Sequence, residues 1–169
     1  MLQLRRKGLD VRTLVETGKA VAAAVGGMDV TLLMNGSVEA AVRAGFQGVH
    51  LPAFTPGVAA IRASLPAGFR IGMSVHDGAE LADAEKQGAD FVVLGPVFPP
   101  RCKAAGTAPL GLARLRELAG GTRMPTLALG GISADNAEDA LACGVAGLAG
   151  ISFFHHPGEL ERILKRIGG

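Results

Sequence analysis

Short apolar runs alternate with longer amphipathic stretches along the whole chain. The apolar runs occupy residues 1–5, 29–34, 47–51, 69–74, 90–95, 125–130 and 146–151. The stretches that follow them carry apolar residues at helical spacing, over residues 11–25, 37–45, 57–65, 79–89, 111–119, 134–144 and 158–167. Continuous apolar strands, rather than alternating ones, are typical of parallel strands covered on both faces. The pattern therefore predicts seven βα units in an α/β fold.

The number of units leaves the form of the sheet open. A closed (β/α) barrel has eight strands and usually about 250 residues, whereas this chain has 169 residues. A doubly wound sheet and a barrel lacking its opening βα unit are both compatible with the periodicity. No linker or low-complexity segment divides the chain, so we expect one domain over residues 1–169.

Composition and charge argue against several classes of protein. The formal net charge is +2, the basic residues are scattered apart from two short runs, and Trp and Tyr are absent. Neither a nucleic-acid-binding patch nor an aromatic platform for bases is therefore indicated. No apolar run is long enough to span a bilayer, and no signal peptide is apparent. Two cysteines are too few for a disulfide framework, which favours a reduced, cytoplasmic protein.

Polar residues at the ends of the first two strands are candidates for binding, because parallel α/β folds bind ligands at the carboxyl ends of their strands. Gln3, Arg5 and Lys7 occupy alternate positions, a set that suits a bound anion or, alternatively, marks an exposed edge strand. The next strand ends in Met34 and Asn35, and the glycine that follows makes this ordinary turn chemistry.

Two further strand ends carry chemically versatile residues. Ser74 and His76 end the run over residues 69–74, where an imidazole either relays protons or has a structural role. The run over residues 90–95 leads into a long loop with Cys102, Lys103 and Gly106, and long ordered loops commonly act as lids. Cys102 is either a thiol activated by its lysine neighbour or a small buried side chain.

The last two apolar runs lead into small residues. One run ends at Gly130 and Gly131, and the other at Ile151 and Ser152. Loops after the last two strands of an eight-stranded barrel form its common phosphate site, where main-chain N–H groups and a helix N-terminus face the anion. A phosphorylated small molecule is therefore the predicted ligand. The sequence has no motif that points independently to a metal, a nucleoside triphosphate or NAD.

The strand ends together resemble one known family. The segments QLRRK, LLMNG, GVHLP, IGMSVHD, GADFVVLGPVF with the following CK and G, LALGGI and GVAGLAGIS resemble, in order, the thiamin-phosphate synthase/TenI family of TIM-type barrels. The family begins with a further strand and helix, so the resemblance implies a barrel lacking its first βα unit. We expect the gap to be covered by a partner subunit or by a longer natural product. The resemblance also implies a homodimer.

The family has two branches, and the residues favour one of them. The synthase branch joins a pyrimidine pyrophosphate to a thiazole phosphate with Mg²⁺ held by carboxylates, but Gly36 and Thr55 lie near the places of these acids. MNG, HLP, SVH and CK are more similar to the TenI branch, the thiazole tautomerases, which are isomerases of thiamin biosynthesis that need no metal. We therefore predict a tautomerase with no cofactor. The alternatives are the Mg²⁺-dependent synthase and a non-catalytic protein that binds thiazole phosphate or thiamin phosphate.

The resemblance also implies a role for each candidate residue. His76 would be the catalytic proton shuttle, and Ser74 would position the substrate. The substrate phosphate would be bound by the main-chain N–H groups of Gly130, Gly131, Ile151 and Ser152. Partners for the ring carboxylate or other substrate oxygens would be Arg5, Asn35 and Lys103. Gln3, Arg5 and Lys7 are similar to the pyrophosphate-binding residues of the synthase branch, which keeps that alternative open.

Overall fold

Strands and helices alternate strictly in the computed structural model, which describes residues 1–99 and 108–168. The strands are β1 (Leu2–Leu4), β2 (Leu32–Asn35), β3 (Gly48–Leu51), β4 (Arg70–Val75), β5 (Phe91–Leu94), β6 (Thr126–Leu129) and β7 (Gly147–Ala149). The helices are α1 (Val11–Ala24), α2 (Val38–Arg43), α3 (Val58–Ala63), α4 (Gly78–Lys86), α5 (Gly111–Gly120), α6 (Ala137–Leu141) and α7 (Pro157–Ile167). A 3₁₀ turn, η1 (Ser152–His155), precedes α7.

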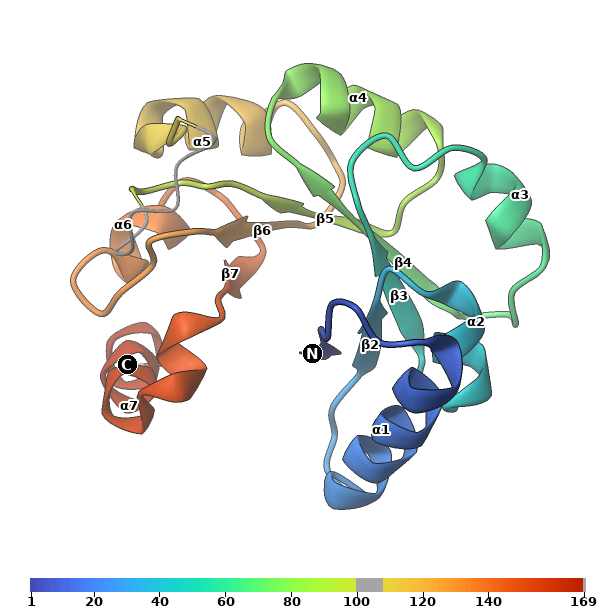
Figure 1. Ribbon diagram of the computed structural model, residues 1–169. Helices are drawn as coiled ribbons and strands as arrows, with labels where there is room; N and C mark the ends of the chain where they lie inside the picture. Colours follow the sequence, from blue (N-terminus) through green and yellow to red (C-terminus); the bar gives the residue numbers. More distant parts are fainter. Residues whose placement is uncertain (100–107, 169) are drawn as a thin grey trace.

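The strands form one parallel sheet in the order β1-β2-β3-β4-β5-β6-β7. The sheet curls, with the helices on its outer side, so that β1 and β7 lie on either side of an opening (Figure 1). This arrangement confirms the predicted TIM-type barrel with seven βα units, as opposed to a doubly wound sheet with helices on both faces. That a partner or a further segment covers the opening stays a prediction.

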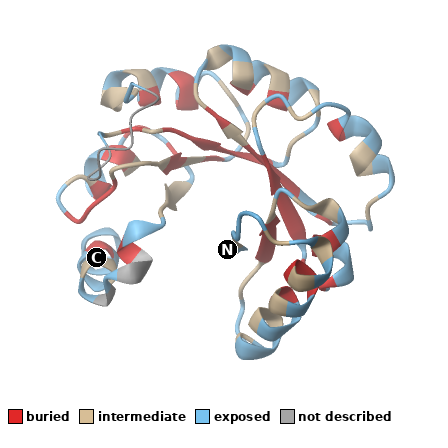
Figure 2. Ribbon diagram, in the orientation of Figure 1, coloured by how far each residue is buried: buried red, intermediate tan, exposed pale blue. Residues whose placement is uncertain are grey.

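The main core lies between the sheet and its helices. Outward-facing residues of the strands, among them Met34, Val49, Ile71 and Leu94, are fully buried in this layer. The alternate strand positions face the inside of the curl, where Leu33, Phe91 and Val93 form a smaller cluster. Figure 2 shows the same division, with buried strands under helices whose outer faces are exposed. Burial on both faces explains why the strands read as continuous apolar runs.

Three helices begin at a side-chain cap that the sequence places directly after a strand or loop. Asp10 accepts a hydrogen bond from the N–H of Thr13 at 3.0 Å, and Ser37 accepts one from Ala40 at 3.1 Å. Asp77 caps α4 by accepting from Glu80 at 2.9 Å. Such caps satisfy N–H groups that the first turn of a helix leaves unpaired, and each is worth about 1 kcal/mol.

The inner layer is tight enough at β4 that a methyl group there is expected to destabilise the fold. A Cβ atom on Gly72 would lie 2.1 Å from the Phe91 ring, which is itself buried. We therefore expect Gly72→Ala to lower the free energy of unfolding by about 1–3 kcal/mol, because overpacking forces neighbours to shift. Urea denaturation measures this. Gly120→Ala, at the open end of α5, is the control and should be neutral or slightly stabilising; equal midpoints for the two variants would contradict the packing argument.

Candidate functional site

Two adjoining cavities open on the inner side of the sheet. The larger, about 640 Å³, has Gln3, Arg5 and His50 as polar wall residues. The rest of its wall is mostly apolar and comes from the inner face of the sheet and from α7, among them Leu33, Phe91 and Ile163. The smaller, about 410 Å³, lies where β6 and β7 end; its wall includes Gly130, Gly131, Ile132, Gly150, Ile151 and Ser152. Ala149, Gly150 and Ile151 belong to both walls. A ligand or pair of ligands can therefore extend from one cavity into the other.

The glycine turn after β6 is a close approach between two segments of main chain. Gly130 has φ +100° and Gly131 has φ +64°, a region that favours glycine. A Cβ atom on Gly131 would lie 2.7 Å from both the Cβ of Phe98 and the carbonyl oxygen of Pro99. The turn therefore has no room for side chains on this side, and its main chain forms part of the smaller cavity wall. Main chain free of side chains is what a bound phosphate requires.

Asn136 holds this glycine turn in shape. Its side-chain oxygen accepts a hydrogen bond from the N–H of Ser133 at 2.8 Å. Its side-chain nitrogen donates to the carbonyl oxygen of Gly131 at 3.0 Å. One amide side chain therefore fixes both ends of the segment that lines the smaller cavity.

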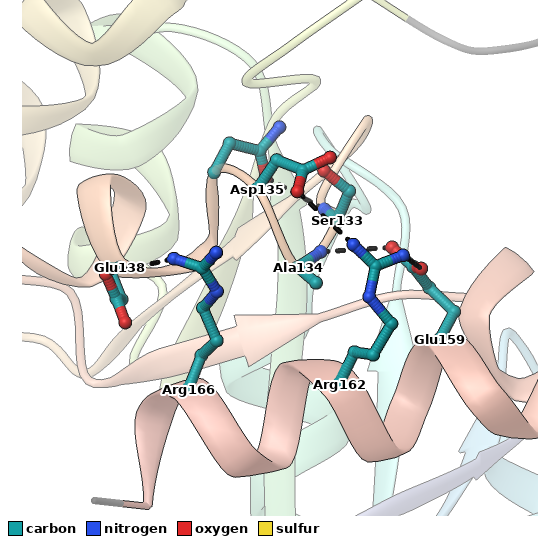
Figure 3. A network of polar contacts seen from close by, with 8 residues as sticks. Ser133, Ala134, Asp135, Glu138, Glu159, Arg162 and Arg166 are labelled. Atoms are coloured by element: carbon teal, nitrogen blue, oxygen red, sulfur yellow. Dashed lines mark hydrogen bonds and ion pairs between the residues drawn. The ribbon is translucent and has the colours of Figure 1, made fainter.

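Helix α7 supports the same segment from outside through a network of charged residues (Figure 3). Glu159 accepts a hydrogen bond from the N–H of Ala134 at 3.0 Å and pairs with Arg162 at 3.1 Å. Arg162 also reaches Asp135 at 3.4 Å, and Arg166 pairs with Glu138 of α6 at 3.7 Å. Individual exposed pairs add little stability, but together these contacts connect α7 to the loop before α6.

His50, in the wall of the larger cavity, is hydrogen-bonded to Ser74 of β4. The His50 Nε2 atom lies 2.8 Å from the Ser74 Oγ atom, and the ring packs edge-on against Phe91 at 6.2 Å between centroids. His50 is only 5% exposed. Burial of the ring, and then the Arg5 cation, lower the pKa of His50 to about 4. His50 is therefore neutral at physiological pH.

His50 is a site residue that sequence reasoning missed. The signal was present, because a histidine interrupts the apolar strand GVHL at a position that pairs with Asn35 of β2. Residues paired across parallel strands face the same side of the sheet, so the inward candidates Asn35 and Ser74 indicate an inward His50.

His76 is held by the first turn of α4. The carboxylate of Glu80 accepts from the main-chain N–H of His76 at 2.7 Å and lies 2.7 Å from its Nδ1 atom. The His76 side chain is 42% exposed and the Glu80 side chain 13%. The pair fixes the ring orientation, and His76 lies in the wall of neither cavity.

The remaining candidates are distributed between the site and other places. Gln3 and Arg5 line the larger cavity, Asn35 is half-buried at the end of β2, and Lys7 is exposed in the turn after β1. Met34 has to be removed from the candidates, because its side chain faces the helices and is fully buried in the main core. Cys102, Lys103 and Gly106 lie outside the described residues.

The described residues at the strand ends do not form a Mg²⁺ site of their own. Among residues 1–99 and 108–168, no group of three or more His, Cys, Asp or Glu side chains could hold a metal ion. Gly36 follows Asn35, and Thr55 donates its hydroxyl to the carbonyl oxygen of Pro52 at 2.8 Å. Mg²⁺ prefers charged oxygen ligands, and neither position supplies one.

Separately, no helix of the described chain has the length and apolarity to cross a bilayer.

Comparison with known proteins points to a single family. A family profile described as thiamine monophosphate synthase (TMP-TENI) matches residues 1–154. The chain is 36% identical to a thiamine-phosphate synthase of Methanoculleus marisnigri, over 99% of this chain and 79% of the relative. It is 37% identical to one of Neisseria meningitidis serogroup B, over 97% of this chain and 80% of the relative.

A solved structure shows the same architecture. The thiamine phosphate pyrophosphorylase from Pyrococcus furiosus superimposes with a TM-score of 0.85 at 28% identity, covering 98% of this chain and 81% of the other.

The predicted thiazole tautomerase is wrong. The relatives are named for a synthase, which is a transferase and not an isomerase. MNG, HLP and SVH therefore do not identify the isomerase branch. The missing carboxylates at Gly36 and Thr55 do not identify the isomerase branch either.

Proposed function

The chain belongs to the thiamine monophosphate synthase/TenI family, and we propose on this basis that it is a thiamin-phosphate synthase, a transferase of thiamin biosynthesis. The reaction joins a pyrimidine pyrophosphate to a thiazole phosphate. The bond between the pyrimidine's methylene carbon and the pyrophosphate oxygen breaks, and a bond from that carbon to the thiazole nitrogen forms. Thiamin phosphate and pyrophosphate are the products.

The observation that carries the proposal is the pair of adjoining cavities. Because both substrates of this reaction carry phosphate groups, the site has to bind two anions while it holds the reacting atoms together. The smaller cavity, with Gly130, Gly131, Ile151 and Ser152 in its wall, suits the thiazole phosphate. The larger cavity has Gln3 and Arg5 in its wall and suits the pyrimidine pyrophosphate.

The other candidate residues take positioning roles in this proposal. Asn35 and Ser74, from the strands on either side of β3, would hydrogen-bond substrate oxygens or ring nitrogens next to His50. As the family resemblance implies, Lys7 would add positive charge for the leaving pyrophosphate, and Lys103, which lies outside the described residues, would bind substrate oxygens. The net reaction breaks and forms no bond to hydrogen, so we assign His76 no proton transfer; its ring is held by Glu80 and lines neither cavity. A homodimer and a cytoplasmic location stay predictions.

The direct test supplies both substrates to the purified chain. We expect thiamin phosphate to appear, measured by its oxidation to a fluorescent thiochrome, together with one equivalent of released pyrophosphate. Each substrate alone, with the same chain, is the control. The synthase proposal would be overturned if no thiamin phosphate formed at substrate concentrations at which both substrates bind to the chain.

One specific observation favours a second candidate function. The absence of carboxylates at positions 36 and 55 removes groups that the synthase branch uses for Mg²⁺. A chain that keeps both anion sites without them could bind thiamin phosphate or its thiazole precursor without converting it. Calorimetric binding of thiamin phosphate, combined with no turnover of the substrate pair, would support this binding function.

A further inference from the structure

The acidic side chains at the carboxyl ends of the described strands are already bonded to the protein. After β1, Asp10 accepts from the N–H of Thr13 at 3.0 Å and from its hydroxyl at 2.8 Å. After β4, Asp77 caps α4 and Glu80 accepts two hydrogen bonds from His76. After β6, Asp135 pairs with Arg162. None of these four carboxylates lines either cavity, so none lies where it would hold Mg²⁺ against a ligand there.

At the two positions where the synthase branch has acids, this chain supplies no carboxylate to a metal ion. Gly36 adopts φ +78° and donates its N–H to the carbonyl oxygen of His50 at 2.8 Å. The Thr55 hydroxyl is hydrogen-bonded to Pro52. In the sequence, residues 100–107 contain neither Asp nor Glu. The carboxylates that would normally hold Mg²⁺ against a pyrophosphate are therefore missing from this chain's own residues.

A basic side chain, Arg5, lies at the carboxyl end of β1, at the same edge of the sheet. Arg5 and Gln3 both line the larger cavity. The pKa of His50 is lowered mainly by burial and, to a smaller extent, by the positive charge of Arg5. The neutral imidazole adds no charge of its own. A pyrophosphate at this end of the cavity would meet a guanidinium, which binds phosphate oxygens through paired hydrogen bonds.

We propose that this chain binds the pyrophosphate end of its substrate through basic side chains, with Arg5 in the cavity wall as the main one, and without Mg²⁺ held by carboxylates. The proposal rests on the proposed function for the identity of the ligand. It concerns binding, so it is tested apart from turnover: a chain that makes no thiamin phosphate can still bind pyrophosphate in this way, and an active synthase can still fail the binding test.

The first experiment titrates inorganic pyrophosphate into the full chain by calorimetry. We expect binding in buffer with EDTA, and no strengthening when Mg²⁺ replaces EDTA. Arg5→Gln should weaken binding by about tenfold or more, because a charge-assisted pair is lost. Arg6→Gln is the matched control, since Arg6 is the exposed neighbour outside the cavity wall, and it should change affinity less than about twofold. Binding only with Mg²⁺, no binding in either buffer, or equal losses in both variants would overturn the proposal.

The second experiment builds a metal ligand into the site. A side chain at Gly36 meets no atom within 4 Å of its Cβ, and Asp and Asn tolerate positive φ better than most residues. Gly36→Asp adds one carboxylate beside the proposed pyrophosphate, and Mg²⁺ is commonly held by one or two carboxylates plus substrate phosphates. We expect Mg²⁺ to strengthen pyrophosphate binding by about tenfold in Gly36→Asp and not in the isosteric Gly36→Asn. Equal Mg²⁺ dependence in the wild type and Gly36→Asp would contradict the inference.

Discussion

Replacing Gly131 by alanine is expected to weaken phosphate binding by about 10- to 100-fold, because hydrogen bonds to a charged ligand are worth about 1.5–3 kcal/mol each. The φ of +64° costs an alanine about 1–2 kcal/mol. Its Cβ would also lie 2.7 Å from the carbonyl oxygen of Pro99, so the turn has to move. Movement of the turn displaces the main-chain N–H groups that we assign to the thiazole phosphate.

The measurement for Gly131→Ala is calorimetric titration with thiamin phosphate, alongside urea denaturation. Gly144→Ala is the matched control, because Gly144 has φ +85° but nothing within 4 Å of its Cβ and lies after α6, outside both cavity walls. It should cost about 1 kcal/mol of stability from backbone strain and leave affinity unchanged. Similar losses of affinity in both variants would show that the turn has no special role in binding.

Acidification from pH 7.5 to 5.0 is expected to cost the fold about 2 kcal/mol through His50 alone. The pKa of His50 is about 4 in the folded chain, against 6.5 for an ordinary histidine. Between these values the unfolded chain binds a proton that the folded chain excludes, so stability falls as the pH falls through this window. Above pH 6.5 the ring is neutral in both states and the effect disappears.

The control for this prediction is His50→Gln, whose amide can still hydrogen-bond Ser74 but does not titrate. Denaturation curves of both proteins at a series of pH values give the difference in their stability. Contributions from Asp and Glu side chains are common to both and cancel to first order. Parallel stability profiles between pH 7.5 and 5.0 would rule out His50 as the buried titrating group.

Part of the candidate site could be predicted from the order of residues. Gly130, Gly131, Ile151 and Ser152 follow two apolar runs that had to be neighbouring parallel strands, and they line one cavity in the structure. Their placement depends on local turn chemistry and on strand order, which both follow from the sequence. Their binding of a phosphate stays a prediction.

Other members depend on contacts between distant segments. His50 and Ser74 are 24 positions apart, and their hydrogen bond follows from the register between β3 and β4. Met34 was wrongly placed in the site, because a strand end alone does not say which alternate residue faces inward. In the sheet, Asn35 of β2 pairs with His50 of β3 and faces inward with it, so the preceding residue, Met34, faces the helices.

The alternation of apolar runs with amphipathic stretches was enough to define seven βα units, because each strand and helix is specified by periodicity within a few residues of itself. It was not enough to distinguish a curled sheet from a doubly wound one, since the side of the sheet on which each helix packs is a long-range property. The folded chain also decided which charges remain available: local sequence contains acids near the strand ends, but only tertiary packing commits them to caps and ion pairs and leaves Arg5 on the cavity wall. Electrostatic character at a site is a sum over neighbours, and neighbours in space are set by the fold.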